Sequence, residues 1–279
     1  MRTILLTTIA MVAFAANSVL ARLAFATAHA EPLSYTGIRL AAGAITLAIL
    51  LLARRQSLRP AGSWAGATAL FGYAILFSIA YILLGAGTGA LILFASVQFG
   101  ILGWAIFRGD RPKALEWVGL ILAFGGLVYL VSPGLVAPHP IGTALMIGAG
   151  LCWAAYTLIG RGSTTPLADT AGNFIRTLPV AIVLLAAGLA LQIPSPLAAL
   201  YAILSGALAS GVGYAVWYAV LPALTRTRAA IVQLTVPAIA AIGGILFIGE
   251  APGLRLTLAG IAIIGGVALA LTAAGRRKT

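Results

Sequence analysis

The chain has 279 residues, of which 62% are hydrophobic and 8% are charged, and its mean hydropathy is +1.10. A water-soluble domain of this length does not bury so large a share of apolar side chains, so the composition indicates an integral membrane protein. The formal net charge of +12 does not indicate a nucleic-acid partner, because the basic residues are scattered singly between apolar runs and form no patch.

Ten stretches are apolar and long enough to cross a bilayer, which takes about 20 residues. Only short connections join them, so no soluble domain fits between them. The stretches are residues 3–26, 34–53, 63–84, 89–107, 114–132, 141–160, 170–190, 198–220, 229–248 and 256–274. We therefore predict an all-α integral membrane protein with ten transmembrane helices.

The first of these stretches allows a second interpretation, a cleaved signal peptide. Residues 1–30 combine a basic start, an apolar run and the sequence Ala28-His29-Ala30, which is similar to a signal-peptidase site. The apolar run is too long for a signal core, and it contains Asn17 and Arg22. We favour a transmembrane helix and keep the cleaved signal as the alternative.

The basic residues fall on one side of the predicted helices. With the N-terminus in the cytoplasm, thirteen of the 17 Lys and Arg residues lie in cytoplasmic segments, and one, Arg255, lies in an outer loop. Basic loops stay in the cytoplasm during membrane insertion, so both ends of the chain are predicted to be cytoplasmic.

The chain also contains an internal repeat. Residues 226–270 align with residues 86–130 at an offset of 140, and each stretch reads as an apolar segment, a Gly-acid-x-Pro turn and a second apolar segment. The turns are residues 109–112 and 249–252. Such a long repeat indicates a chain built from two halves.

The two halves are predicted to be inverted with respect to each other. Each half holds five crossings, and an odd number reverses the orientation of the second half in the membrane. We predict a first five-helix repeat over residues 1–135 and a second, inverted repeat over residues 136–279. Inverted repeats are typical of secondary transporters, in which the substrate path lies between the halves.

Two sets of charged residues near the helix ends repeat with offsets between 137 and 139. They are Arg22, Glu31 and Arg39 around the first outer loop, and Arg161, Asp169 and Arg176 around a cytoplasmic loop. One interpretation is a charged latch at each mouth of a transport path. The other is ordinary ion pairing that neutralises an arginine embedded in the membrane.

Prolines and glycines indicate hinges and close packing. Pro179 and Pro237 fall within the seventh and ninth stretches and are predicted to kink those helices. The fifth and tenth stretches carry many glycines, which let helix backbones approach closely in lipid, so they are predicted to be packing helices. These glycines are Gly119, Gly125, Gly126, Gly260, Gly265 and Gly266.

Uncharged polar and aromatic side chains recur at the middle depth of several predicted helices. Amides at this depth need partners, and the interfacial aromatic belt does not explain aromatic residues there. We predict that they line a binding cavity for a small-molecule substrate, with helix-to-helix packing as the alternative for any single residue. The set is Phe14, Asn17, Tyr73, Phe77, Tyr81, Gln98, Trp153, Tyr156, Tyr214, Trp217 and Gln233.

Several kinds of chemistry have no residues to carry them. The five acidic residues lie near loops, so no carboxylate is placed for a proton relay at mid-membrane. The single cysteine, Cys152, excludes a disulfide and a cysteine-based metal site. No catalytic triad, metal cluster or phosphate-binding loop is evident. We predict neither an enzyme nor a cofactor, and transport driven by a solute gradient or by a coupling ion.

A family resemblance rests on the second half. Residues 210–218 (SGVGYAVWY), Ala229-Ala230, Pro237 and residues 249–252 (GEAP) resemble the pattern of the drug/metabolite transporter superfamily, in particular its EamA-type ten-helix exporters. The resemblance implies helices 1–4 and 6–9 around a central cavity, helices 5 and 10 outside it, and efflux of amino acids, aromatic or otherwise apolar, and related metabolites. It also implies a bacterial inner membrane, with lipid and substrate as partners and no obligate protein partner. In one departure, the first repeat has Val97-Gln98 where the second has Pro237.

Other functions remain open at the level of sequence. The leading alternative is an exporter of cationic drugs or of small metabolites of a different class, because aromatic faces also bind cations. A channel is disfavoured, since no selectivity filter or charge ring is evident. A scaffold without a path would have apolar residues at Asn17, Gln98 and Gln233.

Overall fold

The fold is taken from a computed structural model, which describes residues 1–55, 61–109, 114–132, 137–161, 163–224, 232–251 and 253–275. Within these ranges the chain is helical and contains no strand. The elements are α1 (Arg2–Ala26), α2 (Pro32–Ala53), α3 (Trp64–Leu83), α4 (Ala86–Phe107), α5 (Ala114–Val131), α6 (Pro140–Ile159), α7 (Pro166–Leu191), α8 (Pro196–Leu204), the π-helix η1 (Ser205–Val212), α9 (Gly213–Val220), the 3₁₀ turn η2 (Leu221–Ala223), α11 (Val236–Ile248) and α12 (Leu254–Gly275).

Eight helical segments in the described ranges are long and apolar enough to cross a membrane. One of them is the continuous run Pro196–Ala223, formed by α8, η1, α9 and η2. Two shorter apolar helices, Ala114–Leu130 and Val236–Ile248, accompany them. The predicted all-helical, multi-pass architecture is confirmed, while the exact number of ten crossings stays a prediction.

Prolines mark where several helices begin. α2, α6, α7 and α8 each start at a proline, namely Pro32, Pro140, Pro166 and Pro196. The first N–H groups of a helix have no partner within the helix. A proline at this position therefore removes no helical hydrogen bond, and its fixed φ favours the helix.

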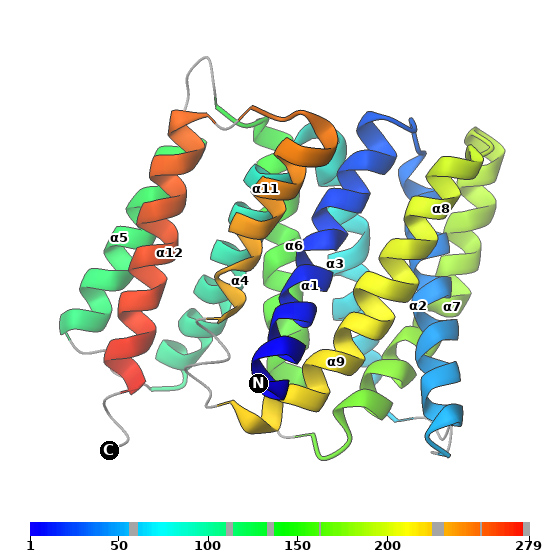
Figure 1. Cartoon of the computed structure of the whole chain (residues 1–279), viewed down its shortest axis with the longest axis horizontal. Helices are drawn as coiled ribbons and strands as arrows, with labels where there is room; N and C mark the ends of the chain where they lie inside the picture. Colours follow the sequence, from blue (N-terminus) through cyan, green and yellow to red (C-terminus); the bar gives the residue numbers. More distant parts are fainter. Residues whose placement is uncertain are drawn as a thin grey trace.

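Figure 1 shows two groups of helices. α5 and α12 lie side by side at one edge, and the other helices form a bundle in which α1 packs on α11, α2 on α7, and α3 and α4 on α6. α1 begins and α12 ends on the same side of the molecule. The boundary between the predicted halves, at residues 135 and 136, is not within the described ranges.

Close packing of α5 on α12 explains some of the glycines but not all. A Cβ atom added to Gly266 would lie 2.5 Å from the Gly119 oxygen and 2.5 Å from the Ala123 nitrogen, so only glycine fits. Gly126 packs equally closely on α12, with Ala262 and Ile263. No atom lies within 4 Å of a Cβ added to Gly125 or Gly265, and one added to Gly260 would be 3.8 Å from Leu91. The glycine pattern therefore predicted the packed face correctly at three positions and overestimated its width.

The ninth stretch is broken next to Pro237, and a hinge role for this proline stays a prediction. Pro237 is the second residue of α11, and residues 234 and 235 just before it form a turn. The ninth stretch is thus interrupted before the proline, because the ring cannot supply an N–H in a helix interior. Pro179 lies inside α7, which continues through it from Pro166 to Leu191.

The two repeated turns share one backbone feature. Gly109 and Gly249 have φ angles of 96° and 75°, in the left-handed region that favours glycine. Gly249 closes the C-terminus of α11, and Gly109 follows the end of α4. Residues 110–112 and 252, which complete the turns, are not among the described residues.

Candidate functional site

A small cavity lies in the middle of the bundle. Its walls come from α1, α3, α4, α6, α9 and the segment before α11, and they consist of Phe14, Asn17, Ser18, Tyr73, Phe77, Leu93, Phe94, Trp153, Tyr214 and Gln233. The space open to the centre of a water molecule is ≈ 30 Å³, which is room for about one or two waters. In this conformation the cavity is therefore too small to hold an amino acid.

Aromatic rings form most of the wall. The ring of Trp153 stacks on Tyr214 with centroids 5.4 Å apart and lies 4.8 Å from the ring of Tyr73. Phe14 contacts Tyr214 at 5.7 Å, and Phe77 contacts Tyr73 at 5.2 Å. These rings come from four helices, so movement of any one of those helices changes the shape of the cavity.

Asn17 connects the cavity to the π-helix η1. The hydroxyls of Ser205 and Ser210 donate hydrogen bonds to its Oδ1 atom at 2.8 and 3.3 Å. π-Helical turns are rare and are frequent at functional sites. The sequence analysis did not anticipate η1, although two serines in an otherwise apolar stretch were a visible signal of buried polar contacts.

Seven of the eleven predicted cavity residues line it: Phe14, Asn17, Tyr73, Phe77, Trp153, Tyr214 and Gln233. Gln233 reaches it from the short segment before α11. Irregular backbone at membrane depth is tolerated where it lines a cavity, so the break before Pro237 and this placement of Gln233 belong together. Ser18, Leu93 and Phe94 are cavity residues that the sequence analysis did not single out.

The remaining four predicted residues lie near the cavity without lining it. Trp217 contacts Phe14 at 5.9 Å, and Tyr81 contacts Phe77 at 4.6 Å, so both support the wall from behind. The Tyr156 hydroxyl lies 3.3 Å from the Thr170 hydroxyl and belongs to a contact with α7. Gln98 is buried on α4.

The charged residues do not pair as their sequence neighbourhood suggests. Arg22 Nε lies 3.2 Å from Glu250 Oε1, and this is the ion pair found among the described residues. The Glu250 carboxylate also accepts the Ala86 N–H at 3.0 and 2.9 Å, so it joins α1, α4 and α11. Glu31 instead caps α2 by accepting the N–H groups of Leu33 and Ser34.

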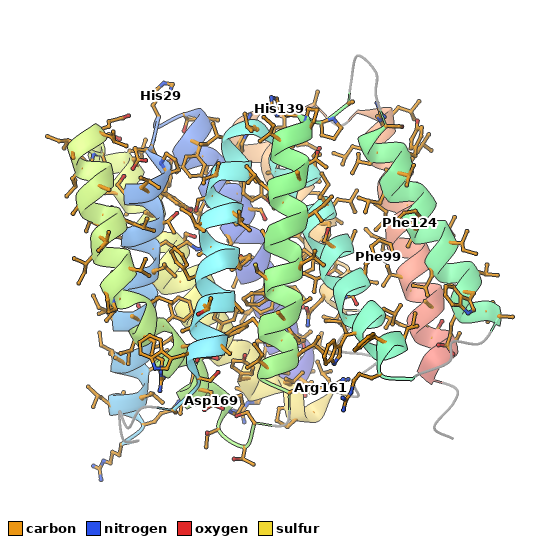
Figure 2. All side chains as sticks on the ribbon, turned by 180° about the vertical axis from the view of Figure 1, so that it is seen from behind. His29, Phe99, Phe124, His139, Arg161 and Asp169 are labelled. Atoms are coloured by element: carbon orange, nitrogen blue, oxygen red, sulfur yellow. The ribbon has the colours of Figure 1, made fainter. Side chains whose placement is uncertain are left out.

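Polar contacts at the opposite end join α7 to the start of α3. Asp169 accepts the Gly62 N–H at 2.9 Å and a short bond from the Ser163 hydroxyl. Arg176 donates to the Ala61 and Gly172 carbonyls. Arg161 is exposed at this end, and Figure 2 shows Arg161 and Asp169 far from His29 and His139 at the other end.

Arg39 lies in the interior and not at a mouth of the bundle. It is 2% exposed, and its Nη2 donates to the Tyr73 hydroxyl at 3.1 Å. Its guanidinium carbon lies 4.6 Å from the ring centroid of Phe77 and 5.2 Å from that of Tyr73. Arg39 therefore touches two residues of the cavity wall.

The fold is that of a multi-pass helical membrane protein, and comparison with known proteins identifies its family. The EamA-like transporter family matches residues 1–132 and again residues 140–272. The chain belongs to the EamA-like transporter family, within the drug/metabolite transporter superfamily.

Individual relatives are similar over different lengths. The uncharacterized protein PA1977 of Pseudomonas aeruginosa is 50% identical, over 91% of this chain and 89% of that protein. The threonine/homoserine exporter RhtA of Escherichia coli is 38% identical over 54% of this chain and 52% of its own length. The uncharacterized inner membrane transporter YedA of the same species is 32% identical over 60% of this chain and 54% of its own length.

A solved crystal structure covers 98% of this chain and 98% of its own, with a TM-score of 0.68. Its sequence is 21% identical, so this likeness concerns the fold alone. The residues in the second half also resemble those of the bacterial aromatic amino-acid exporter YddG, and this narrower resemblance stays a prediction.

Proposed function

We propose that this chain exports amino acids and related metabolites across the bacterial inner membrane, by alternating access through the central cavity. The observation that carries the proposal is the cavity itself, with its aromatic wall and the amides of Asn17 and Gln233. Ligand sites are mostly apolar with a few placed polar groups, which suits an amino acid with an aromatic or other apolar side chain. The relative named for threonine and homoserine export supports the same substrate class.

Many alternating-access carriers are built from two halves of opposite orientation, and the helix directions support such an arrangement here. α1 runs from the lower to the upper side of Figure 1. α6 runs the other way, since His139 at its start is at the top of Figure 2 and Arg161 after its end is at the bottom. We propose ten crossings in two inverted halves, 1–135 and 136–279, with both termini in the cytoplasm.

The small volume of the cavity fits a carrier better than a pore. An amino acid is much larger than the one or two waters that the cavity holds, so its binding requires the aromatic wall to move. A wall drawn from both halves opens when the halves rock, which is the motion that inverted-repeat carriers use.

The test is exchange of radiolabelled amino acids in liposomes that contain the purified protein. We expect saturable counterflow of L-threonine, L-homoserine, L-phenylalanine or L-leucine, above that of empty vesicles. Counterflow separates a carrier from a channel, because a pore shows no trans-stimulation. Vesicles with protein that move none of these amino acids, but do move dicationic drugs, would establish the alternative of a cationic-drug exporter.

A further inference from the structure

Arg39 is a buried cation without an anion. In the described part of the chain no carboxylate lies within ion-pairing distance of it, and its Nη1 atom has no hydrogen-bond partner. Arginine stays protonated in proteins, so the charge cannot be removed by losing a proton. Charged side chains inside a membrane protein are rare, usually pair with one another or with backbone carbonyls, and often mark substrate or ion pathways.

A second polar atom near Arg39 is also unsatisfied. Tyr35 lies one helical turn before Arg39 and thus on the same face of α2. Its side chain is 1% exposed, and its hydroxyl lies near Ser205 of η1 without forming a hydrogen bond of normal geometry. Arg39 Nη1 and the Tyr35 hydroxyl are thus two donors on one face of α2 that lack a well-formed hydrogen bond, and the Tyr73 hydroxyl lies beside Arg39. A carboxylate suits such a group of donors, because its two oxygens accept several hydrogen bonds.

The backbone around Arg39 is held firmly in place. η1 packs against α2 there, and a Cβ atom added to Gly206 would lie 2.2 Å from the Arg39 carbonyl oxygen. The same π-helix bonds Asn17 in the cavity wall through Ser205 and Ser210. Arg39 and the cavity are therefore positioned by one element.

We propose that Arg39, with the hydroxyls of Tyr35 and Tyr73, binds the carboxylate of the transported solute. This inference rests on the proposed function and narrows it to solutes that carry a carboxylate. Tyr73 belongs to both the cavity wall and the Arg39 contact, so turning its ring exposes the guanidinium to the cavity. The Nη1 group that is free in the described structure then binds one carboxylate oxygen.

The same charge acts against the cationic-drug alternative. Arg39 already lies over the rings of Phe77 and Tyr73. A cationic solute in the cavity would compete for these ring faces and would be repelled at short range, where the surroundings screen charge weakly. A carboxylate-bearing solute is attracted by the same field.

The test compares acids with their amides in equilibrium binding to the detergent-purified protein. In the wild type, L-threonine and L-phenylalanine should bind at least about tenfold more tightly than L-threoninamide and L-phenylalaninamide, since a hydrogen bond to a charged partner contributes that much. Arg39→Gln should weaken binding of the acids to the level of the amides. Arg39→Lys, which keeps the charge, should retain part of the preference. Arg54→Gln, the same change at the exposed arginine that directly follows α2, should not alter the ratio of acid to amide binding.

The outcomes separate this inference from the proposed function. Equal binding of acids and amides by the wild-type protein would overturn the carboxylate subsite, and this measurement needs no variant to fold. An unchanged ratio in a folded Arg39→Gln protein would assign Arg39 a purely structural role and overturn it as well. A preference for acids that Arg39→Gln abolishes would support the subsite even if the liposomes show no flux, in which case only the proposed function fails.

Discussion

Asn17 lies at the contact between the cavity wall and the π-helix η1. We expect it to affect solute binding more strongly than it affects stability. As a structural partner of Ser205 and Ser210, it contributes about 0.6–1.7 kcal/mol, the range measured for interhelical hydrogen bonds in membranes. As a wall residue that meets the solute, it also affects binding. We expect Asn17→Ala to lower counterflow about tenfold, which corresponds to about 1.4 kcal/mol, while the melting temperature falls by only a few degrees.

Thr157→Ala serves as the control for this change. Thr157 is exposed on α6, and its hydroxyl bonds only to the carbonyl of Trp153 in the same helix. It should leave both flux and melting temperature unchanged. If Asn17→Ala lowered the melting temperature but left flux intact, Asn17 would be a packing residue only.

Single residues also show which parts of the candidate site could be predicted from the sequence. Asn17 and Gln233 stood out because an amide is unexpected at membrane depth, and both line the cavity. The partner of Arg22 could not be inferred, because Glu250 is 228 positions away while Glu31 is near in sequence. Leu93 and Phe94 carried no signal, since an apolar residue in an apolar helix looks the same in a wall and in a lipid-facing surface.

At the scale of elements, α5 and α12 contribute no described residue to the cavity wall. Their packing can therefore be changed without changing the cavity. A Cβ atom at Gly266 would meet the backbone of Gly119 and Ala123 at 2.5 Å, whereas one at Gly265 would meet nothing within 4 Å. Backbone atoms cannot turn aside as side chains do. We therefore expect Gly266→Ala to lower the unfolding free energy by about 1–3 kcal/mol, the usual cost of overpacking.

Gly265→Ala is the matched control one residue away. It should be neutral or stabilise the helix by about 0.5–1 kcal/mol, because alanine favours the helix over glycine. Thermal unfolding in detergent measures both. Binding of L-threonine to folded Gly266→Ala protein should equal that of the wild type; weaker binding would show that α5 and α12 take part in the path.

Elements were predictable where the local chemistry decides them. Proline at the first position placed the starts of α2, α6, α7 and α8 within a few residues of the apolar stretches. The π-helix η1 was not predictable, because it depends on tertiary contacts such as those of Gly206 with α2 and of Ser205 with Asn17. In the ninth stretch the apolar run did not show the turn at residues 234 and 235, whereas Pro237, the second residue of α11, was a signal of the helix start at Val236.

At the scale of the whole molecule, the proposed alternating access requires the two halves to separate at one end of the bundle while they stay together at the other. Glu250 closes the end that is predicted to face outward, since it binds Arg22 of α1 and the N–H of Ala86 at the start of α4. The negative charge also suits the positive end of the α4 dipole. In the proposed cycle, opening this end breaks both contacts, so we expect Glu250 to influence the balance between the closed and the open state.

Glu250→Gln should therefore shift the molecule toward the outward-open state. Loss of a charge-assisted contact of about 1–1.4 kcal/mol changes a two-state population about five- to tenfold. The reporter is Ser18→Cys in the cavity wall, in a Cys152→Ala background, labelled in intact cells with a thiol reagent that does not cross the membrane. We expect Glu250→Gln to raise the labelling rate about five- to tenfold. Arg22→Gln should raise it less, because Glu250 still accepts the Ala86 N–H in that variant. Glu31→Gln changes a carboxylate that only caps α2 and should leave the rate unchanged; an equal rise there would mean that general loosening, and not this contact, controls access to the cavity.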